Sequence, residues 1–429
     1  MMYRIRGMRG FLASSTGVTC AAALALPLAP PAAATTSSSA PPVTSPTARL
    51  DAHALGGGTQ SLPLAPLAHD RAPGAAEQGL PRRDVRHFSL VGVVWDNPAT
   101  ELHGRVEVRT RATATGTWSG WRELETHNAD HAADPGTPES TSGRVRGATA
   151  PLWVGESDGV EVRVRAEDAA ATARTAPAAA RLPTGLRLEL VDPGEDAPPP
   201  ANRARTEAAE ATEPAVLPAL PARQKTEPHA GPRPRITTRR GWGADEKLRE
   251  KGFVYTKKIK AVFVHHSDTG NNYRCSQAPS VIRGIYRYHV KSMGWRDLGY
   301  NFLVDKCGNI YEGRAGGVSK PVLGAHTLGF NSNSMGIAVL GTYSSKKPSS
   351  AALKAIARLT AWKVGLYGMN ARGKTYLKSG GGNLYPKGRK VRLNVISGHR
   401  DGFATNCPGK KLYAKLGTAR AKAAAYQGR

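Results

Sequence analysis

Three side chains in the C-terminal half of the chain are of types that bind transition metals. His265 follows the apolar run 261–264, and His399 and Cys407 lie in one loop punctuated by glycine and proline. Two imidazoles and one thiolate can bind zinc and leave a fourth position for water, whose pKa then falls toward about 7. The sequence therefore predicts a hydrolytic zinc site. His266 competes with His265 as a ligand, and the two should face opposite ways because successive strand residues do.

Apolar runs and amphipathic stretches provide the elements that would position this site. The runs 261–264, 301–304 and 336–340 are typical of central strands. Residues 280–289 and 349–367 have the apolar spacing of helices, and the second begins with a serine cap. This mixture predicts an α/β domain with a mixed central β-sheet flanked by helices.

The region before this domain has the pattern of short strands. Residues 105–111 and 160–165 alternate between apolar and charged side chains, and Gly, Pro and Asp residues separate the alternating stretches. The pattern predicts a smaller all-β, sandwich-like domain that precedes the α/β domain. No chemistry can be predicted from its residues.

The remaining segments have compositions typical of targeting signals and linkers. Three arginines precede an Ala- and Leu-rich stretch that ends in small residues, which is the pattern of a secretory signal peptide. Segments rich in Ala, Pro, Ser or Glu bury too little apolar surface to fold. We expect an exported protein without a stable membrane anchor. The predicted order is a signal peptide (1–34), a disordered spacer (35–84), the β domain (85–195), a linker (196–233), the α/β domain (234–420) and a basic tail (421–429).

Positive charge is concentrated in the C-terminal half. The chain has 60 Lys and Arg residues against 33 Asp and Glu residues, a net charge of +27. From Gly231 onward there are 37 basic and 8 acidic residues, and the part before it has a net charge of −2. An exported basic domain is expected to bind anionic cell-wall polymers, through stem-peptide carboxylates or teichoic phosphates. Nucleic acid is the general alternative, but no nucleic-acid motif accompanies the charge.

Seven short motifs follow one another in the C-terminal half. They are Arg239-Arg240-Gly241-Trp242-Gly243-Ala244, Val262-Phe263-Val264-His265-His266-Ser267, the segment 294–302, Ile310-Tyr311-Glu312-Gly313-Arg314, Gly324-Ala325-His326-Thr327, Asn333-Ser334-Met335-Gly336-Ile337 and the segment 398–409. In this order they resemble the family of zinc N-acetylmuramoyl-L-alanine amidases and peptidoglycan recognition proteins, which includes lysozymes of the phage T7 type. The resemblance covers residues from about 235 to 416. Seven ordered motifs are a far more specific signal than any one alone.

The resemblance implies which residues perform the chemistry. It assigns the zinc ligands to His265, His399 and Cys407. His266 should face away from His265 in the strand, so we then interpret it as structural. Tyr300 and Thr405 match the two family positions that stabilise the oxyanion formed when a carbonyl is attacked. Some relatives carry a lysine at this loop position or a glutamate near residue 338. This chain has neither, so its general base is left unassigned.

The resemblance also implies a substrate cleft beside the metal. Neutral amide and imidazole groups there would bind sugar hydroxyls and peptide amides. Trp295 is expected either in the cleft wall or in the core. The expected substrate-binding residues are His326, Asn331, Asn333 and Trp295.

The cysteine count agrees with an exported metalloprotein. Removal of Cys20 with the signal peptide leaves Cys275, Cys307 and Cys407, an odd number. If Cys407 is a metal ligand, the other two can form a disulfide, which an oxidising compartment favours. Two buried free thiols are the alternative.

These inferences together predict a secreted, monomeric zinc amidase. It would hydrolyse the amide between the lactyl group of N-acetylmuramic acid and the first L-alanine of the peptidoglycan stem. One alternative is a recognition protein that binds peptidoglycan without cutting it, but such relatives commonly lack the metal cysteine. The other is a zinc peptidase that cuts within the stem peptide.

Overall fold

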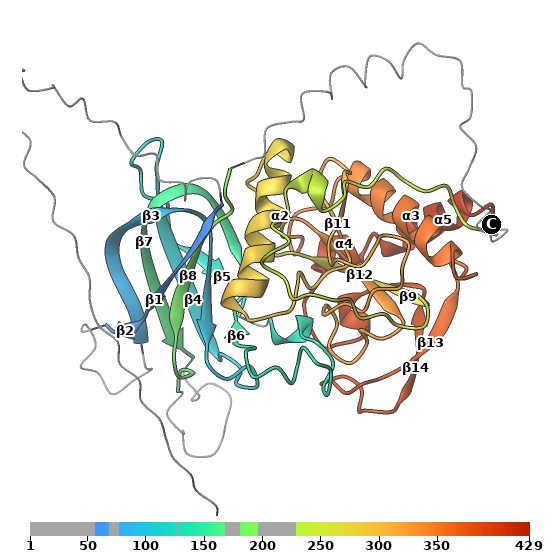
Figure 1. Cartoon of the computed structure of the whole chain (residues 1–429), viewed down its shortest axis with the longest axis horizontal. Helices are drawn as coiled ribbons and strands as arrows, with labels where there is room; N and C mark the ends of the chain where they lie inside the picture. Colours follow the sequence, from blue (N-terminus) through green and yellow to red (C-terminus); the bar gives the residue numbers. More distant parts are fainter. Residues whose placement is uncertain (1–55, 68–76, 127, 168–180, 196–228) are drawn as a thin grey trace, which may run out of the picture. The chain divides into compact units, whose positions relative to one another are not determined.

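A computed structural model of the chain describes residues 56–67, 77–126, 128–167, 181–195 and 229–429 (Figure 1). An eight-stranded sheet forms the N-terminal domain, and a five-stranded sheet with a separate two-stranded ribbon forms the C-terminal domain. The predicted fold class, an all-β domain followed by an α/β domain, is confirmed. The predicted signal peptide and most of the predicted linker lie outside the described residues.

The C-terminal sheet has the strand order β11-β10-β12-β9-β15. Four of its strands run parallel, and β11 pairs antiparallel with β10 at one edge. Nearly all their side chains are buried, as expected for parallel strands with both faces covered. The three predicted strands correspond to β9, β10 and β12. The strands are β9 (Ala261–His266), β10 (Phe302–Val304), β11 (Ile310–Glu312), β12 (Ser334–Val339) and β15 (Ile396–Gly398), and the ribbon is β13 (Lys374–Lys378) with β14 (Lys390–Asn394).

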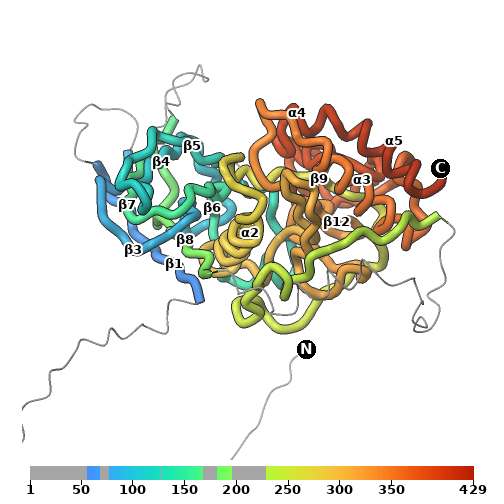
Figure 2. Tube along the Cα trace, turned by 90° about the horizontal axis from the view of Figure 1, so that it is seen from above, coloured from blue at the N-terminus to red at the C-terminus, as the bar shows by residue number. Residues whose placement is uncertain are grey.

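Helices cover the two faces of this sheet. α3 (Ser350–Gly365) and α5 (Leu416–Tyr426) lie side by side and pack on one face (Figure 2). α2 (Ala278–Arg287) packs on the opposite face and continues into a π-helical turn, Tyr288–Ser292. The Oγ of Ser349 accepts a hydrogen bond from the Ala352 amide, so the predicted serine cap of α3 is present. No helix among the described residues is long and apolar enough to cross a membrane.

The prediction of a basic tail at 421–429 is wrong. Helix α5 runs to Tyr426, and its residues Ala423 and Ala424 are buried. Gln427 is also buried and donates hydrogen bonds to the carbonyls of Ala361 and Met369. The alanines form a helical face against α3, whereas the basic residues that suggested a tail point to solvent. The short α4 (Lys410–Tyr413) precedes α5.

The N-terminal domain is built on two long strands. β3 pairs antiparallel with β7, β8 and β6, and bulges interrupt its pairing with β7. Inward-facing Val, Leu, Phe and Trp side chains form its core. The sheet order is β1-β8-β3-β7-β4-β5. The strands are β1 (Gly58–Pro63), β2 (Ala65–Pro66), β3 (Glu77–Trp95), β4 (Gly104–Ala112), β5 (Arg122–Leu124), β6 (Gly147–Ala148), β7 (Leu152–Ala166) and β8 (Arg187–Asp192).

The predicted disordered spacer at 35–84 is wrong where the structure describes it. β1 and β2 lie within it, and β3 begins at Glu77 rather than near residue 85. β1 pairs along its whole length with β8, from Gly58 opposite Asp192 to Pro63 opposite Arg187. An edge strand of this kind is half exposed and stabilised by a remote partner, so its own sequence lacks an apolar run.

A shared core joins the two domains. Leu90 and Trp153 of the β domain are buried in the same apolar cluster as Ile282 and Tyr288 of the C-terminal domain. The Tyr288 hydroxyl donates to the carbonyl of Thr149, 3.1 Å away. The Ser292 hydroxyl donates to Glu189 at 2.8 Å. The β domain is therefore packed firmly against the α/β domain.

A disulfide links Cys275 and Cys307, so the predicted pairing is confirmed. The bridge spans a sequence separation of 32 residues and ties the turn before α2 to the turn after β10. Closing a loop of this length restricts the unfolded chain and stabilises the fold by roughly 3–4 kcal/mol.

We predict that the double substitution Cys275→Ala/Cys307→Ala lowers the free energy of unfolding by about 3 kcal/mol. Denaturant titration of the purified variant measures this change, and bound metal should be retained because neither cysteine lies in the candidate metal cluster. Unchanged stability would show that the bridge does not restrict the unfolded chain.

Candidate functional site

Four buried side chains bring potential metal-binding atoms together. His131, His265, His399 and Cys407 each offer one such atom, and these atoms all lie within 4.8 Å of one another. His265 lies in β9, and His399 directly follows β15, which pairs parallel with β9. Since parallel strands end at the same edge, the two histidines meet there. Three of the four residues were expected from the sequence, and His131 was not.

The ring nitrogens of the two strand-end histidines are oriented by neighbouring oxygens. The Nε2 of His265 lies 3.3 Å from the Thr327 hydroxyl, and its Nδ1 lies 3.7 Å from the Cys407 sulfur. The Nε2 of His399 lies 3.2 Å from the Asp130 carbonyl oxygen. Its Nδ1 is buried without a hydrogen bond to any described residue. Both rings therefore present Nδ1 to the cluster, in the way that outer hydrogen bonds orient metal-binding imidazoles.

His131 comes from the N-terminal domain, on a 3₁₀ turn (Ala129–His131) between β5 and β6. Its Nε2 lies 3.7 Å from the Cys407 sulfur. Its Nδ1 lies 2.7 Å from an oxygen of the Asp130 carboxylate, although the two groups are not aligned as a hydrogen bond. The only sequence signal was two histidines and an aspartate within residues 127–131, in a region without any recognisable motif.

Burial sets the protonation state of the cluster. It lowers the pKa of His265 well below the ordinary value and that of His399 to about 3, so both imidazoles are neutral. Burial also raises the pKa of the Cys407 thiol, with a smaller contribution from Asp130. A bound cation is the species that would stabilise this sulfur as a thiolate. Neutral imidazoles with one thiol are a donor set that fits zinc.

Asp130 is the charged neighbour of the cluster. Burial alone would raise the pKa of its carboxyl, but His131 and His399 outweigh burial and place the pKa below the ordinary value. The group is therefore an ionised carboxylate beside the two histidines. Such a carboxylate typically supports a metal-binding imidazole from behind.

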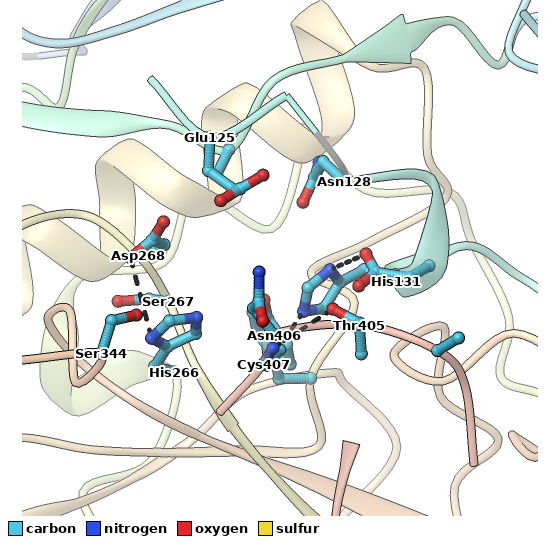
Figure 3. Close-up of a pocket in the computed structure, with 14 residues that line it drawn as sticks. Glu125, Asn128, His131, His266, Ser267, Asp268, Ser344, Thr405, Asn406 and Cys407 are labelled. Atoms are coloured by element: carbon cyan, nitrogen blue, oxygen red, sulfur yellow. Dashed lines mark hydrogen bonds and ion pairs between the residues drawn. The ribbon is translucent and has the colours of Figure 1, made fainter. Parts of the chain in front are cut away.

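A cavity of about 520 Å³ opens beside the cluster (Figure 3). Cys407, His131 and Thr405 line it, together with Glu125 of the N-terminal domain. Tyr300 lines it too, and burial followed by the charges of Cys407 and Asp130 raises the pKa of its phenol well above the ordinary value. The phenol is thus a hydrogen-bond donor at neutral pH. Both predicted oxyanion residues, Tyr300 and Thr405, face the same space as the cluster.

The competing histidine, His266, lines the same cavity but lies outside the cluster. Its Nδ1 accepts from the Tyr343 amide at 3.3 Å and lies 3.7 Å from Asp268. It is not one of the four clustered residues. His266 is therefore not a candidate ligand in this cluster, and its structural role stays a prediction.

The predicted substrate residues are less accessible than expected. His326 is fully buried, with its ring 5.3 Å from that of His265, and Asn331 is 1% exposed. Trp295 is 4% exposed and packs on His289, with ring centres 4.5 Å apart, which is a core position. Asn333 precedes β12, at the edge of the sheet opposite the cluster, and accepts a hydrogen bond from Thr256. Its position does not support a contact with substrate.

The fold and the cluster define an α/β domain with a candidate metal site, and comparisons with known proteins agree with this fold. Residues 255–410 match the N-acetylmuramoyl-L-alanine amidase family, and residues 32–181 match the family described as Rv3811 N-terminal galactose-binding domain-like. Peptidoglycan-recognition protein SC2 of Drosophila simulans is 32% identical over 185 residues, which cover 43% of this chain and 85% of that protein. The chain belongs to the family of peptidoglycan recognition proteins and N-acetylmuramoyl-L-alanine amidases.

Two further proteins are similar to this chain. The human N-acetylmuramoyl-L-alanine amidase is 31% identical over 193 residues, covering 43% of this chain and 28% of that protein. The solved structure of peptidoglycan recognition protein LE in complex with tracheal cytotoxin, a monomeric diaminopimelic acid-type peptidoglycan, is 29% identical. It covers 43% of this chain and 92% of that chain, with a TM-score of 0.33.

We predict that Thr327→Val weakens metal binding by about 10–100-fold, because the Thr327 hydroxyl orients His265. Competition with a chromophoric chelator measures the affinity. Thr360→Val is the matched control, since the Thr360 hydroxyl is buried in α3 without a hydrogen bond to any described residue. Equal affinities in the two variants would contradict the orienting role of Thr327.

Proposed function

We propose that this protein is an exported, zinc-dependent N-acetylmuramoyl-L-alanine amidase of peptidoglycan. The observation that carries the proposal is the convergence of Cys407 with His265 and His399 in one buried cluster. A protein that only recognises peptidoglycan has no need of a metal-binding thiol. The amidase family match over residues 255–410 and the human amidase relative support the same activity.

His265, His399 and Cys407 would hold the zinc ion. Zinc held by three protein ligands lowers the pKa of a bound water to about 7 and polarises a carbonyl oxygen. The protein's own residues would provide the surroundings of the reacting amide and stabilise the charge that develops on its oxygen. The clustered side chains are buried, and a surrounding of low dielectric strengthens electrostatic contacts with the reacting amide.

Tyr300 is placed to stabilise the charge that develops on the amide oxygen. Its ring lies 5.5 Å from that of His265, and the residue is 5% exposed. The raised pKa keeps the proton on the phenol, so Tyr300 can donate a hydrogen bond to an oxyanion. Thr405 lies on the Cys407 loop, where its hydroxyl accepts from the Cys407 amide and can point its own hydrogen toward the cavity.

The substrate and setting follow from charge and family. Peptidoglycan and anionic wall polymers suit the excess of basic residues after Gly231. The Cys275–Cys307 disulfide suits an exported protein. We infer a monomer that acts outside the cytoplasm.

Digestion of purified sacculi tests the activity directly. We expect the zinc-loaded protein to release intact stem peptides that begin with free L-alanine, identified by mass spectrometry. A chelator and the substitution Cys407→Ser should each abolish release together with bound zinc, because a hydroxyl is a poor zinc ligand at neutral pH. Products cut inside the stem would identify a peptidase, and binding to sacculi without any product would identify a recognition protein.

Tyr300→Phe should keep zinc and substrate binding but lower kcat by about 10²–10³-fold, because the donated hydrogen bond acts mainly in the transition state. Steady-state kinetics on a soluble muropeptide measures kcat and KM separately. Tyr376→Phe is the control, since Tyr376 is 57% exposed on the β13–β14 ribbon. An unchanged kcat in Tyr300→Phe would leave Tyr300 with a structural role only.

A further inference from the structure

We propose that His131 of the N-terminal domain is a fourth ligand of the metal, and that the β5–β6 segment, defined as residues 128–146, keeps the protein latent by closing the site. The closed metal site stands on geometry alone. Latency rests on the proposed amidase function. This segment leaves the β domain after β5, passes beside the cluster and returns to β6.

His131 has the surroundings of a metal-binding histidine. It is 8% exposed, and its ring centre lies 4.6 Å from that of His399 and 5.3 Å from that of His265. Its Nε2 faces the Cys407 sulfur, while the Asp130 carboxylate lies behind its Nδ1. A carboxylate behind the outer nitrogen is the usual partner of an imidazole that binds a metal.

The same turn also supports a ligand of the α/β domain. The carbonyl oxygen of Asp130 accepts from the outer nitrogen of His399 at 3.2 Å, and the Leu328 amide donates to that carbonyl at 2.9 Å. Asp130 is itself 3% exposed. Through this one residue the N-terminal domain contributes to two of the four clustered side chains.

Away from the cluster, the β5–β6 segment forms hydrogen bonds with Asn331, a residue that was expected to bind substrate. The side-chain nitrogen of Asn331, Nδ2, donates hydrogen bonds to the carbonyl oxygen of Ala132 at 3.0 Å and to the Asp134 carboxylate at 2.8 Å. Asp134 also accepts from the Gly329 amide at 2.7 Å. These contacts explain why Asn331 is buried, and they leave its side chain no free donor for a muropeptide.

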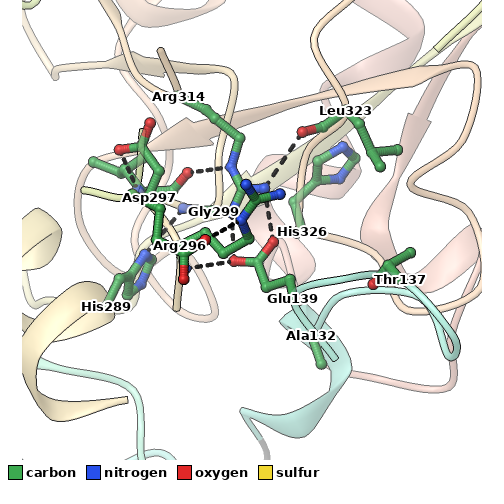
Figure 4. A network of polar contacts seen from close by, with 12 residues as sticks. Ala132, Thr137, Glu139, His289, Arg296, Asp297, Gly299, Arg314, Leu323 and His326 are labelled. Atoms are coloured by element: carbon green, nitrogen blue, oxygen red, sulfur yellow. Dashed lines mark hydrogen bonds and ion pairs between the residues drawn. The ribbon is translucent and has the colours of Figure 1, made fainter. Parts of the chain in front are cut away.

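A buried ion pair fixes the middle of the segment. Both carboxylate oxygens of Glu139 accept from Arg314, at 2.7 and 2.8 Å, and the Arg296 amide donates to the same carboxylate at 3.1 Å (Figure 4). Glu139 and the Arg314 side chain are both almost fully buried. Near the end of the segment, the Arg146 amide donates to the Met293 carbonyl at 3.0 Å.

Four protein ligands make a zinc site structural, whereas catalytic sites keep one position open. With His131 as the fourth ligand, the zinc ion would have no coordination position for a reacting water while the β5–β6 segment stays in place. Within residues 128–146 the only regular element is one 3₁₀ turn, so the segment can withdraw without breaking a strand pairing of either sheet. The cavity beside Cys407 and Thr405 is the space through which a substrate could compete with it.

X-ray absorption at the zinc edge of the full-length protein tests the fourth ligand without reference to activity. We expect the scattering to fit three imidazoles and one sulfur in the wild type, and two imidazoles and one sulfur in His131→Ala. His103→Ala is the matched control, because His103 is exposed elsewhere on the same domain. Two imidazoles in the wild type would overturn the proposal.

A second variant leaves every ligand in place. Asp134→Asn places an amide nitrogen or a weaker acceptor against Gly329 and Asn331, and so loosens the segment. Both His131→Ala and Asp134→Asn should lose zinc to a chelator faster than the wild type and His103→Ala. Equal rates for all four proteins would contradict a closing segment.

Cleavage of a soluble muropeptide tests latency. The initial rate should rise by about tenfold or more in His131→Ala, because the competent state is then no longer a minor population. An unchanged or lower rate with zinc still bound would overturn latency. If the coordination changes as expected but neither protein cleaves the muropeptide, the amidase assignment fails and the four-ligand site is purely structural.

Discussion

The parallel pairing of β9 with β15 is the constraint on which the site depends. Gly398 lies opposite Val264, so His399, which directly follows β15, and His265, near the end of β9, lie at the same edge of the sheet. The loop after His399 returns at once, and the Arg400 amide donates to the Cys407 carbonyl at 3.1 Å. Helices on both faces bury this sheet and hold the two strand ends in place. A rigid sheet edge thus does the positioning that a mobile loop could not.

Burial of this sheet edge disfavours the charged form of the Cys407 thiol, and a bound metal cation would stabilise that form. Neutral histidines and a thiol with a raised pKa lie together, with the Asp130 carboxylate as a charged neighbour. A bound zinc ion would coordinate the ring nitrogens and the sulfur of this cluster and stabilise the thiolate. Because Asp130 and His131 come from the N-terminal domain, metal binding and domain packing would reinforce each other. The shared core around Trp153 and Tyr288 supplies the apolar part of that coupling.

Local patterns in the sequence were sufficient to predict the strands β9, β10 and β12, the helix α3 and three of the four clustered residues. Each of these follows from side chains close together in sequence: an apolar run, a serine cap, or a loop rich in glycine. The edge strand β1 could not be predicted, because its stability comes from pairing with β8 more than a hundred residues away. His131 was missed for the same reason, since only the packing of the β domain on α2 brings its loop to the metal edge. The burial of Asn331 likewise depends on Ala132 and Asp134, which no local pattern connects to it.

Anomalous diffraction at the zinc edge, from crystals of the full-length protein grown with zinc, tests the central claim most directly. We predict one dominant anomalous peak within bonding distance of the Cys407 sulfur and the Nδ1 atoms of His265 and His399. A zinc-saturated crystal with no peak there, or with its dominant peak at another group of residues, would contradict the account.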